Sequence, residues 1–361
     1  MPAALSTNRP IEFDVKIALE QPEHWSVAAT EALQILLGFQ GDAVWHWTIS
    51  GGAEAHTAVR DGGLRKDDAS IDCVTLFSGG LDSTCGIARA HELASRTRLV
   101  SHYSRQKTRQ LEISRILGYQ PPTQIRISGV RGRGRGFLYR SFYFLCLSAA
   151  VASTYETRRI IQYENGILAL AVPPSPAYFM TRHAHPVVQR AAERLFGAVL
   201  GGDWSIENPF LERTKGECTR DIVAILGDEK ATKIIAQTET CWYQYSNQLS
   251  ANRSKRNGIP CGVCVPCIVR RTAVQRLEGH YDLNDQAVRQ DPVLARDFDA
   301  YRKFIDRTKL RGGATRMFLE FPGYVRDLTQ GENAEITRDR LIDLFHRFAI
   351  EFDHAFPSIN S

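Results

Sequence analysis

The sequence predicts an α/β protein built on a parallel sheet with helices on both faces. From residue 71 onward, short β-branched runs alternate with stretches of helical length, which is the order of a parallel sheet. The composition is that of a globular protein, with 43% apolar and 24% charged residues. At 361 residues, the chain is long enough for two or three domains.

The leading segment, residues 1–70, is predicted to be a small α/β extension. It holds a strand at 11–19, a helix at 25–37 and a strand at 43–49, followed by a polar, glycine-rich linker. The main domain, residues 71–280, is predicted to hold the parallel sheet. Its strands are expected at 72–77, 98–103, 123–128 and 159–163, and its helices at 83–95, 106–117, 137–154 and 214–226.

The trailing segment, residues 281–361, is predicted to be helical. Apolar residues recur there at helical spacing and define one apolar face. This pattern indicates a helical cap that packs on the core, and a partner-binding helix is the alternative interpretation. The face consists of Leu341, Leu344, Phe345, Phe348 and Phe352.

The most informative string directly follows the first strand of the main domain. Two glycines there let the backbone approach a ligand closely. The helix that follows offers unpaired N–H groups and a favourable dipole, so the turn suits a phosphate. It is not a Walker A loop, because no Lys-Ser or Lys-Thr pair follows the glycines. An ordinary turn without a ligand is the alternative. The string reads Ser78, Gly79, Gly80, Leu81, Asp82, Ser83 and Thr84.

A cysteine cluster is the second informative feature, with Cys261, Cys264 and Cys267 inside seven residues. Two-residue gaps let neighbouring sulfurs face one metal, and tetrahedral zinc needs a fourth ligand. Cys241 is the candidate, with a nearby histidine as the alternative. Four thiolates leave no open position, which indicates a structural zinc site. Small core residues are the interpretation for Cys73, Cys85, Cys146 and Cys218.

The loop and the cluster together resemble the 7-cyano-7-deazaguanine synthase (QueC-like) family of PP-loop ATP pyrophosphatases. Members join an SGGxDS loop to a CGxCxxC zinc motif. Weaker landmarks follow in the family's order over residues 71–280. The resemblance implies a sheet of the adenine-nucleotide alpha-hydrolase-like (PP-loop) type. These landmarks begin at Tyr103, Arg140, Tyr163, Asn208, Thr214 and Thr238.

The resemblance implies a ligase that activates a carboxylate as an acyl-adenylate and then couples it to an amine. The loop would grip the β,γ-pyrophosphate of ATP, and Mg²⁺ would bridge its oxygens. Asp82 is the nearest carboxylate for Mg²⁺, with helix capping as its alternative role. Predicted catalytic residues are Ser78, Asp82, Arg140 and Lys215, and Tyr103 and Gln106 are predicted to bind the nucleotide together with the loop.

Some of these residues have ordinary alternative roles. Thr214 and Glu217 fit a capping box, which predicts a structural role for Glu217. Lys215, between them, either contacts a phosphate or adenylate or lies on the solvated surface. A basic, glycine-rich loop either closes over ATP or the acid or stays solvated. It contains Arg131, Arg133 and Arg135.

The chain departs from the family synthases in its longer ends, an extra residue near Tyr103 and a wider gap between Cys241 and Cys261. These departures resemble QueC-like proteins of anti-phage operons, such as Qat and type IV CBASS. That resemblance implies coupling of a 7-deazaguanine to the N-terminus of a partner protein. The alternatives are a housekeeping synthase that uses ammonia, a PP-loop tRNA-modifying enzyme and a non-catalytic nucleotide-binding subunit.

The bulk properties narrow the choice of partners. The net charge of +5 permits anionic ligands but does not by itself indicate nucleic acid. No apolar run reaches transmembrane length, so we expect a cytoplasmic protein with no membrane partner. We expect a homodimer or a hetero-complex, acting on a 7-deazaguanine-type small molecule.

Overall fold

A computed structural model describes residues 11–52, 70–93, 95–104, 106–126, 138–174, 180–241, 262, 264–274, 292–309, 328 and 336–356. The chain divides into two compact units, and both are discontinuous in sequence. The predicted boundaries at residues 70 and 280 stay a prediction. The first unit comprises Met1–Ser78, Ala94–Tyr163 and Thr181–Pro209, and the second comprises Gly79–Leu93, Glu164–Met180 and Phe210–Ser361.

The main sheet of the first unit has five strands, all parallel, in the order β5-β4-β3-β6-β7. Four of them lie where the sequence predicts strands, so the predicted parallel α/β class is confirmed. The last was not predicted, because its three residues are too short for a periodicity signal. The strands are β3 (Cys73–Leu76), β4 (Thr97–His102), β5 (Thr123–Ile125), β6 (Arg159–Gln162) and β7 (Ser205–Glu207).

Three helices of the first unit belong to this sheet. Helix α4 (Arg140–Thr154) packs along β3, β4 and β6, and α6 (Pro186–Leu200) packs on α4 and β7. Helix α3 (Lys107–Ile116) is tied to β5 because Gln124 Nε2 donates to the Lys107 carbonyl at 3.2 Å. The sequence analysis missed α6. Pro186 occupies its first turn, where proline needs no N–H acceptor, and the His185 side chain caps it.

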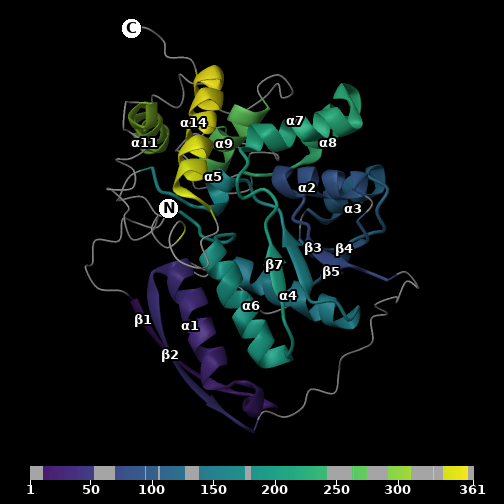
Figure 1. The fold of residues 1–361 in the computed structure, drawn as a ribbon, viewed down its shortest axis with the longest axis vertical. Helices are drawn as coiled ribbons and strands as arrows, with labels where there is room; N and C mark the ends of the chain where they lie inside the picture. Colours follow the sequence, from purple (N-terminus) through teal and green to yellow (C-terminus); the bar gives the residue numbers. More distant parts are fainter. Residues whose placement is uncertain are drawn as a thin grey trace. The chain divides into compact units, whose positions relative to one another are not determined.

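The leading segment forms a smaller layer of the first unit, and its predicted strand–helix–strand order is confirmed. Strands β1 (Ile11–Ala18) and β2 (Ala43–Ser50) pair in parallel. A short 3-10 turn, η1 (Pro22–His24), precedes α1 (Val27–Gly41), which packs on β2 and α6 (Figure 1). Because Leu33, Leu36 and Leu37 are buried in one core with α6, this extension is an integral layer of the unit.

The regular secondary structure described in the second unit is helical. Its core gathers around α14, whose predicted apolar face is buried. Figure 1 shows α14, in yellow, beside α9. This face is therefore covered within the chain, as the cap interpretation predicted. The helices are α2 (Leu81–Glu92), α5 (Gly166–Ala169), α7 (Lys215–Leu226), α8 (Asp228–Gln237), α9 (Val265–Ala273), α11 (Pro292–Lys309) and α14 (Arg338–Ala355).

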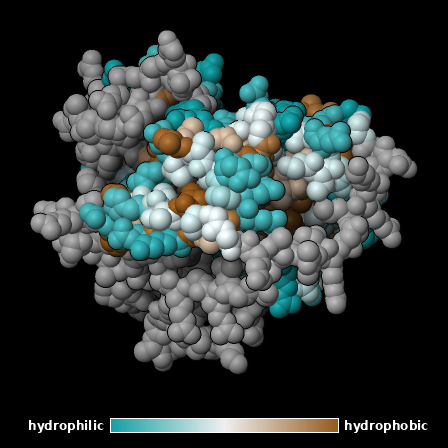
Figure 2. Space-filling model, turned by 90° about the horizontal axis from the view of Figure 1, so that it is seen from below, coloured by the Kyte–Doolittle hydropathy of each residue, from teal (hydrophilic) through white to brown (hydrophobic). Residues whose placement is uncertain are grey.

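Few large hydrophobic side chains are exposed among the residues that the structure describes. On the face drawn in Figure 2, hydrophobic atoms of the described residues form small groups among hydrophilic ones. The three that are at least 60% exposed lie apart in the sequence: Val27 starts α1, Leu93 is the C-cap of α2 and Ile350 lies on α14. Among the described residues, no helix is both long and apolar enough to cross a membrane.

Candidate functional site

The glycine loop lies between a strand and a helix, as the sequence predicts. The Phe77 N–H donates to the Val100 carbonyl at 2.8 Å, and Ser101 Oγ donates to the Phe77 carbonyl at 2.6 Å. These bonds extend the β3–β4 pairing to the edge of the loop. The chain then turns at Gly79, whose φ of 80° lies in the left-handed region that favours glycine.

The start of α2 has no side-chain cap. Its N-cap is Gly80, which has no side chain to cap the first N–H groups. The Gly80 carbonyl accepts the first helical hydrogen bond from the Thr84 N–H at 3.0 Å and another from Ser83 Oγ at 3.1 Å. A helix cannot satisfy its first N–H groups internally, and its dipole favours negative charge there.

Two buried side chains, Lys215 and Asn165, contact Asp82 in the first turn of α2. The Lys215 ammonium donates to Asp82 Oδ2 at 2.6 Å, and Asn165 Nδ2 donates to the same oxygen at 3.2 Å. Asn165 Nδ2 also lies 3.3 Å from Glu164 Oε1, so the amide brings the two carboxylates together. Lys215 is 0% exposed and Asp82 5%. The alternative of a solvated Lys215 is therefore wrong.

The charges of this cluster influence one another strongly. Burial raises the pKa of Asp82 to about 7, while the Lys215 ammonium opposes the rise and the Glu164 carboxylate reinforces it. Burial alone would lower the pKa of Lys215, but the carboxylates of Asp82 and Glu164 raise it above its ordinary value. Lys215 therefore stays protonated, and two carboxylates share its single positive charge.

Two buried oxygens of the loop have no hydrogen-bond partner within the described part of the chain: Asp82 Oδ1 and Thr84 Oγ1. An unsatisfied buried polar group costs about 1–3 kcal/mol, so a ligand that bonded to these two oxygens would remove that cost. Asp82 caps no helix, because both bonds to its other oxygen come from side chains. A carboxylate oxygen beside a second carboxylate fits a hard cation such as Mg²⁺.

Helix α7 positions Lys215 through the predicted capping box, which is confirmed. The Glu217 N–H donates to Thr214 Oγ1 at 3.1 Å, and the Thr214 N–H donates to Glu217 Oε2 at 2.9 Å. Side chains of α14 add to this box. Arg347 pairs with Glu217, and Thr214 Oγ1 donates to Glu351 Oε1 at 2.8 Å. The trailing helix therefore supports the turn that carries Lys215.

Gly216 makes this support possible, and a substitution there tests it. A Cβ at Gly216 would lie 2.2 Å from Glu351 Oε1, which forces the carboxylate away from Thr214. Loss of a hydrogen bond to a charged group costs about 1.5–3 kcal/mol. We therefore expect Gly216→Ala to lower the free energy of unfolding in urea by about 1 kcal/mol, despite the better helix propensity of alanine.

The control for Gly216→Ala is the same change in a Glu351→Ala background. With the carboxylate gone, alanine has room and its helix propensity dominates, so the substitution should then raise the free energy of unfolding. An equal loss in both backgrounds would contradict the role given to Glu351, because contacting residues should show an interaction energy in such a cycle.

Two predicted nucleotide-binding residues lie in the first unit, near the start of α3. The Lys107 ammonium donates to the Tyr103 hydroxyl at 2.6 Å, and this bond lowers the pKa of the phenol. Gln106 is the N-cap of α3, and its N–H donates to Ser104 Oγ at 3.2 Å. The assignment of Tyr103 and Gln106 to nucleotide binding stays a prediction.

Two predicted catalytic residues also belong to the first unit. The Ser78 carbonyl accepts a hydrogen bond from Gln110 Nε2 at 3.0 Å, which ties the loop to α3. Arg140 is the first residue of α4, and its guanidinium lies 5.4 Å from the centre of the Phe144 ring. Burial lowers the pKa of Arg140. Their catalytic roles stay predictions, and Arg131, Arg133 and Arg135 lie outside the described residues.

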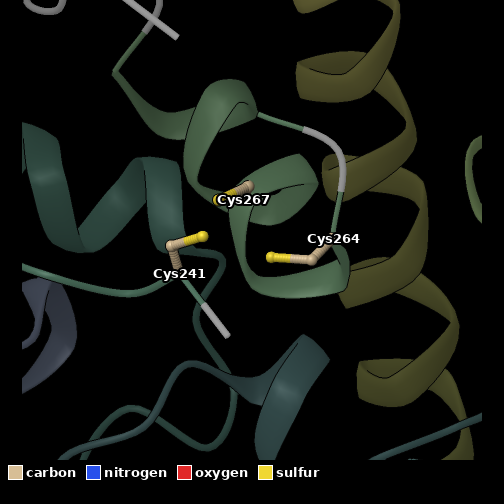
Figure 3. A group of neighbouring side chains, drawn as sticks. All are labelled: Cys241, Cys264 and Cys267. Carbon is tan, nitrogen blue, oxygen red and sulfur yellow. The ribbon is translucent and has the colours of Figure 1, made fainter. Parts of the chain in front are cut away.

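The second candidate site is the cysteine cluster of the second unit. The sulfur atoms of Cys241, Cys264 and Cys267 lie within 4.8 Å of one another, and Figure 3 shows them pointing into one space. Sulfurs around a tetrahedral zinc lie about 3.8 Å apart, so the cluster can hold a metal such as zinc. Cys264 is the N-cap of α9 and Cys267 lies in its first turn. Cys261 lies outside the described residues.

The other cysteines behave as the sequence analysis predicts. Cys73, Cys85 and Cys218 are buried at 1% exposure or less, whereas Cys146 is half-buried. Burial raises the pKa of Cys146 to about 12 and that of Cys218 well above its ordinary value. The thiols of Cys146 and Cys218 are therefore protonated at neutral pH, which suits small packed residues and not metal ligands.

The sequence analysis did not assign three of the polar residues that organise these sites. Glu164 and Asn165 follow β6 after one intervening residue, and residues at the carboxyl ends of parallel strands often form ligand sites. That placement is the signal that could have found them. Arg270 is 1% exposed on α9, and no sequence pattern marks it, since one arginine in an amphipathic helix is ordinarily solvated.

The comparisons with protein families and with curated proteins found no match for this sequence.

Proposed function

We propose that this protein is an ATP-dependent ligase of the PP-loop type, with the adenine-nucleotide alpha-hydrolase-like fold, that breaks ATP into AMP and pyrophosphate. One observation carries the proposal: the buried Lys215–Asp82 pair in the first turn of α2, with Asp82 Oδ1 left without a partner. The two glycines and the uncapped helix end next to it supply the phosphate-binding backbone.

The residues of the loop act on the departing pyrophosphate in this proposal. The substrate carboxylate attacks the α-phosphorus, the bond between that phosphorus and the bridging α,β-oxygen breaks, and the pyrophosphate leaves with the electron pair. N–H groups at the start of α2 and the Lys215 ammonium stabilise the charge that grows on it. Asp82 and Glu164 are the residues that would hold Mg²⁺, which supplies further positive charge to the phosphates.

The acyl-adenylate is then consumed by an amine. The nitrogen attacks the acyl carbon, AMP leaves, and the amine loses a proton, so that an amide forms. We propose that the acid is a 7-deazaguanine carboxylate and that the amine is the N-terminus of a partner protein in anti-phage defence. The resemblance to QueC-like proteins and the long terminal segments support this choice.

Three other functions share the loop and remain alternatives. A housekeeping 7-cyano-7-deazaguanine synthase would use ammonia, and a second ATP would dehydrate the amide to the nitrile. A PP-loop tRNA-modifying enzyme would need a broad basic surface, whereas the net charge is only +5. A non-catalytic nucleotide-binding subunit would not need the buried Lys215–Asp82 pair.

We further propose that the protein is cytoplasmic and works as a homodimer or hetero-complex. The cysteine cluster would hold a structural zinc ion, with Cys261 as the fourth ligand next to the three observed sulfurs. A closed thiolate site has no open position for substrate, so zinc would fix the surrounding loops and take no part in adenylation.

Product analysis tests the proposal. The protein is incubated with ATP, Mg²⁺, 7-carboxy-7-deazaguanine and either ammonia or a candidate partner protein, and the products are weighed. We expect AMP and pyrophosphate, with the deazaguanine mass added to the partner. A free nitrile would favour the housekeeping alternative. Release of ADP and phosphate would overturn the AMP-forming mechanism, and salt-sensitive tRNA binding would favour the tRNA-modifying alternative.

A further inference from the structure

One short segment of the second unit contacts both candidate sites. Residues 238–241, here called the coupling segment, leave the end of α8 and terminate at Cys241. The N–H of Glu239 donates to the carbonyl of Gly79 at 3.2 Å. Gly79 is the left-handed residue of the phosphate-binding turn. The segment therefore connects a metal ligand to the backbone of the nucleotide loop over three residues.

A buried arginine holds the coupling segment to the helix that carries the other cysteines. Arg270 Nη1 donates to Thr238 Oγ1 at 2.7 Å and to Thr240 Oγ1 at 3.1 Å, and Nη2 donates to the Ile235 carbonyl at 2.8 Å. Arg270 lies one helical turn after Cys267 on α9. Arg270 is 1% exposed, so water cannot replace a hydrogen bond that its guanidinium loses. Each lost bond would therefore lower the stability of the folded state.

We propose that the coupling segment makes nucleotide affinity depend on metal occupancy, with Arg270 as the positioning residue. A metal bound by Cys264 and Cys267 fixes Cys241, which fixes Glu239 and hence the Gly79 carbonyl. The inference rests on the proposed function, because it takes the loop to be the ATP site. Linkage then requires that bound nucleotide strengthens metal binding by the same factor that metal strengthens nucleotide binding.

The first test measures this factor from both sides in the full chain. The dissociation constant of a non-hydrolysable ATP analogue is measured with Mg²⁺ in zinc-loaded and zinc-free protein. Zinc affinity is measured by chelator competition with and without the analogue. We expect both ratios to be equal and about tenfold. A ratio near one, with the analogue still bound, would overturn the coupling and leave the proposed function intact.

A second test avoids removing the metal. Thr240→Val removes one acceptor of Arg270 and keeps the side-chain volume, while all cysteines remain. We expect weaker binding of the analogue to the zinc-loaded variant and faster release of zinc to a chelator. Unchanged values for both would overturn the role of Arg270. The matched control is Thr308→Val, a buried threonine of the same unit whose hydroxyl donates to the Ile305 carbonyl at 2.7 Å.

The two proposals fail in distinguishable ways. If the analogue binds neither zinc-loaded nor zinc-free protein while the chain stays folded, the proposed ATP site is wrong. The proposed coupling is then wrong as well, because it depends on that site. If the analogue binds and only the zinc dependence is missing, the coupling alone is wrong. Zinc content and circular dichroism of each variant show which of these cases applies.

Discussion

Lys215→Met is expected to reduce AMP formation by about 10²–10³-fold, the usual effect of removing one donor that stabilises transition-state charge. The substitution also removes the cation next to the buried Asp82 carboxylate. The Lys215 ammonium lies 2.6 Å from Asp82 Oδ2, which is the closest contact between charged groups of the cluster. Breaking a buried ion pair from one side costs about 3–5 kcal/mol. Turnover is measured by pyrophosphate release, and stability by urea unfolding.

Two further variants separate the effect on stability from the effect on catalysis. Lys233→Met, on α8 of the same unit, removes an ammonium from an exposed pair with Glu229 and should change stability by less than about 1 kcal/mol. Lys215→Met combined with Asp82→Asn removes both charges and should recover part of the lost stability without recovering turnover. Full turnover in the Lys215→Met variant would contradict the proposed site.

The largest loss of stability is expected from Cys267→Ser, which removes one thiolate from a cluster whose sulfurs lie within 4.8 Å of one another. Metal binding at a structural site contributes to folding directly. We expect purified Cys267→Ser to retain little zinc and to unfold about 10 °C below the wild type, since a loss of several kcal/mol shifts a large domain by that much. Metal analysis and thermal unfolding measure the two effects.

Cys146→Ser provides the matched control for the zinc measurement. Cys146 is half-buried on α4 of the first unit and belongs to no metal cluster within the described residues. Its zinc content should equal that of the wild type. If Cys146→Ser lost zinc and Cys267→Ser kept it, the assignment of the metal centre would be wrong.

Much of the fold follows from local patterns that the sequence displays. The strand predicted at 72–77 forms β3, because a β-branched run is followed by two glycines that the turn requires. The capping box at Thr214 could be predicted because it is a contact between residues three apart in the sequence. The apolar face of α14 could be predicted because its period of 3.6 residues extends over several turns.

The features that the sequence did not reveal depend on contacts between distant residues. Lys215 and Asp82 are 133 residues apart, and only the packing of α2 against α7 buries them together. Arg270 reaches Thr238 across 32 residues. No local sequence pattern reveals that Lys215 or Arg270 is buried, because a lysine or arginine on a helix is ordinarily exposed to solvent. Helix α6 was missed because the Pro186 that starts it also fits a loop.

The central claim is that the turn at Gly79 and Gly80 holds the phosphates of ATP. The most direct test is a crystal structure of the protein with a non-hydrolysable ATP analogue and Mg²⁺. We expect β- and γ-phosphate oxygens within about 3.2 Å of N–H groups at the start of α2, with the cation beside Asp82 Oδ1. Phosphates bound at any other place in the chain would contradict it.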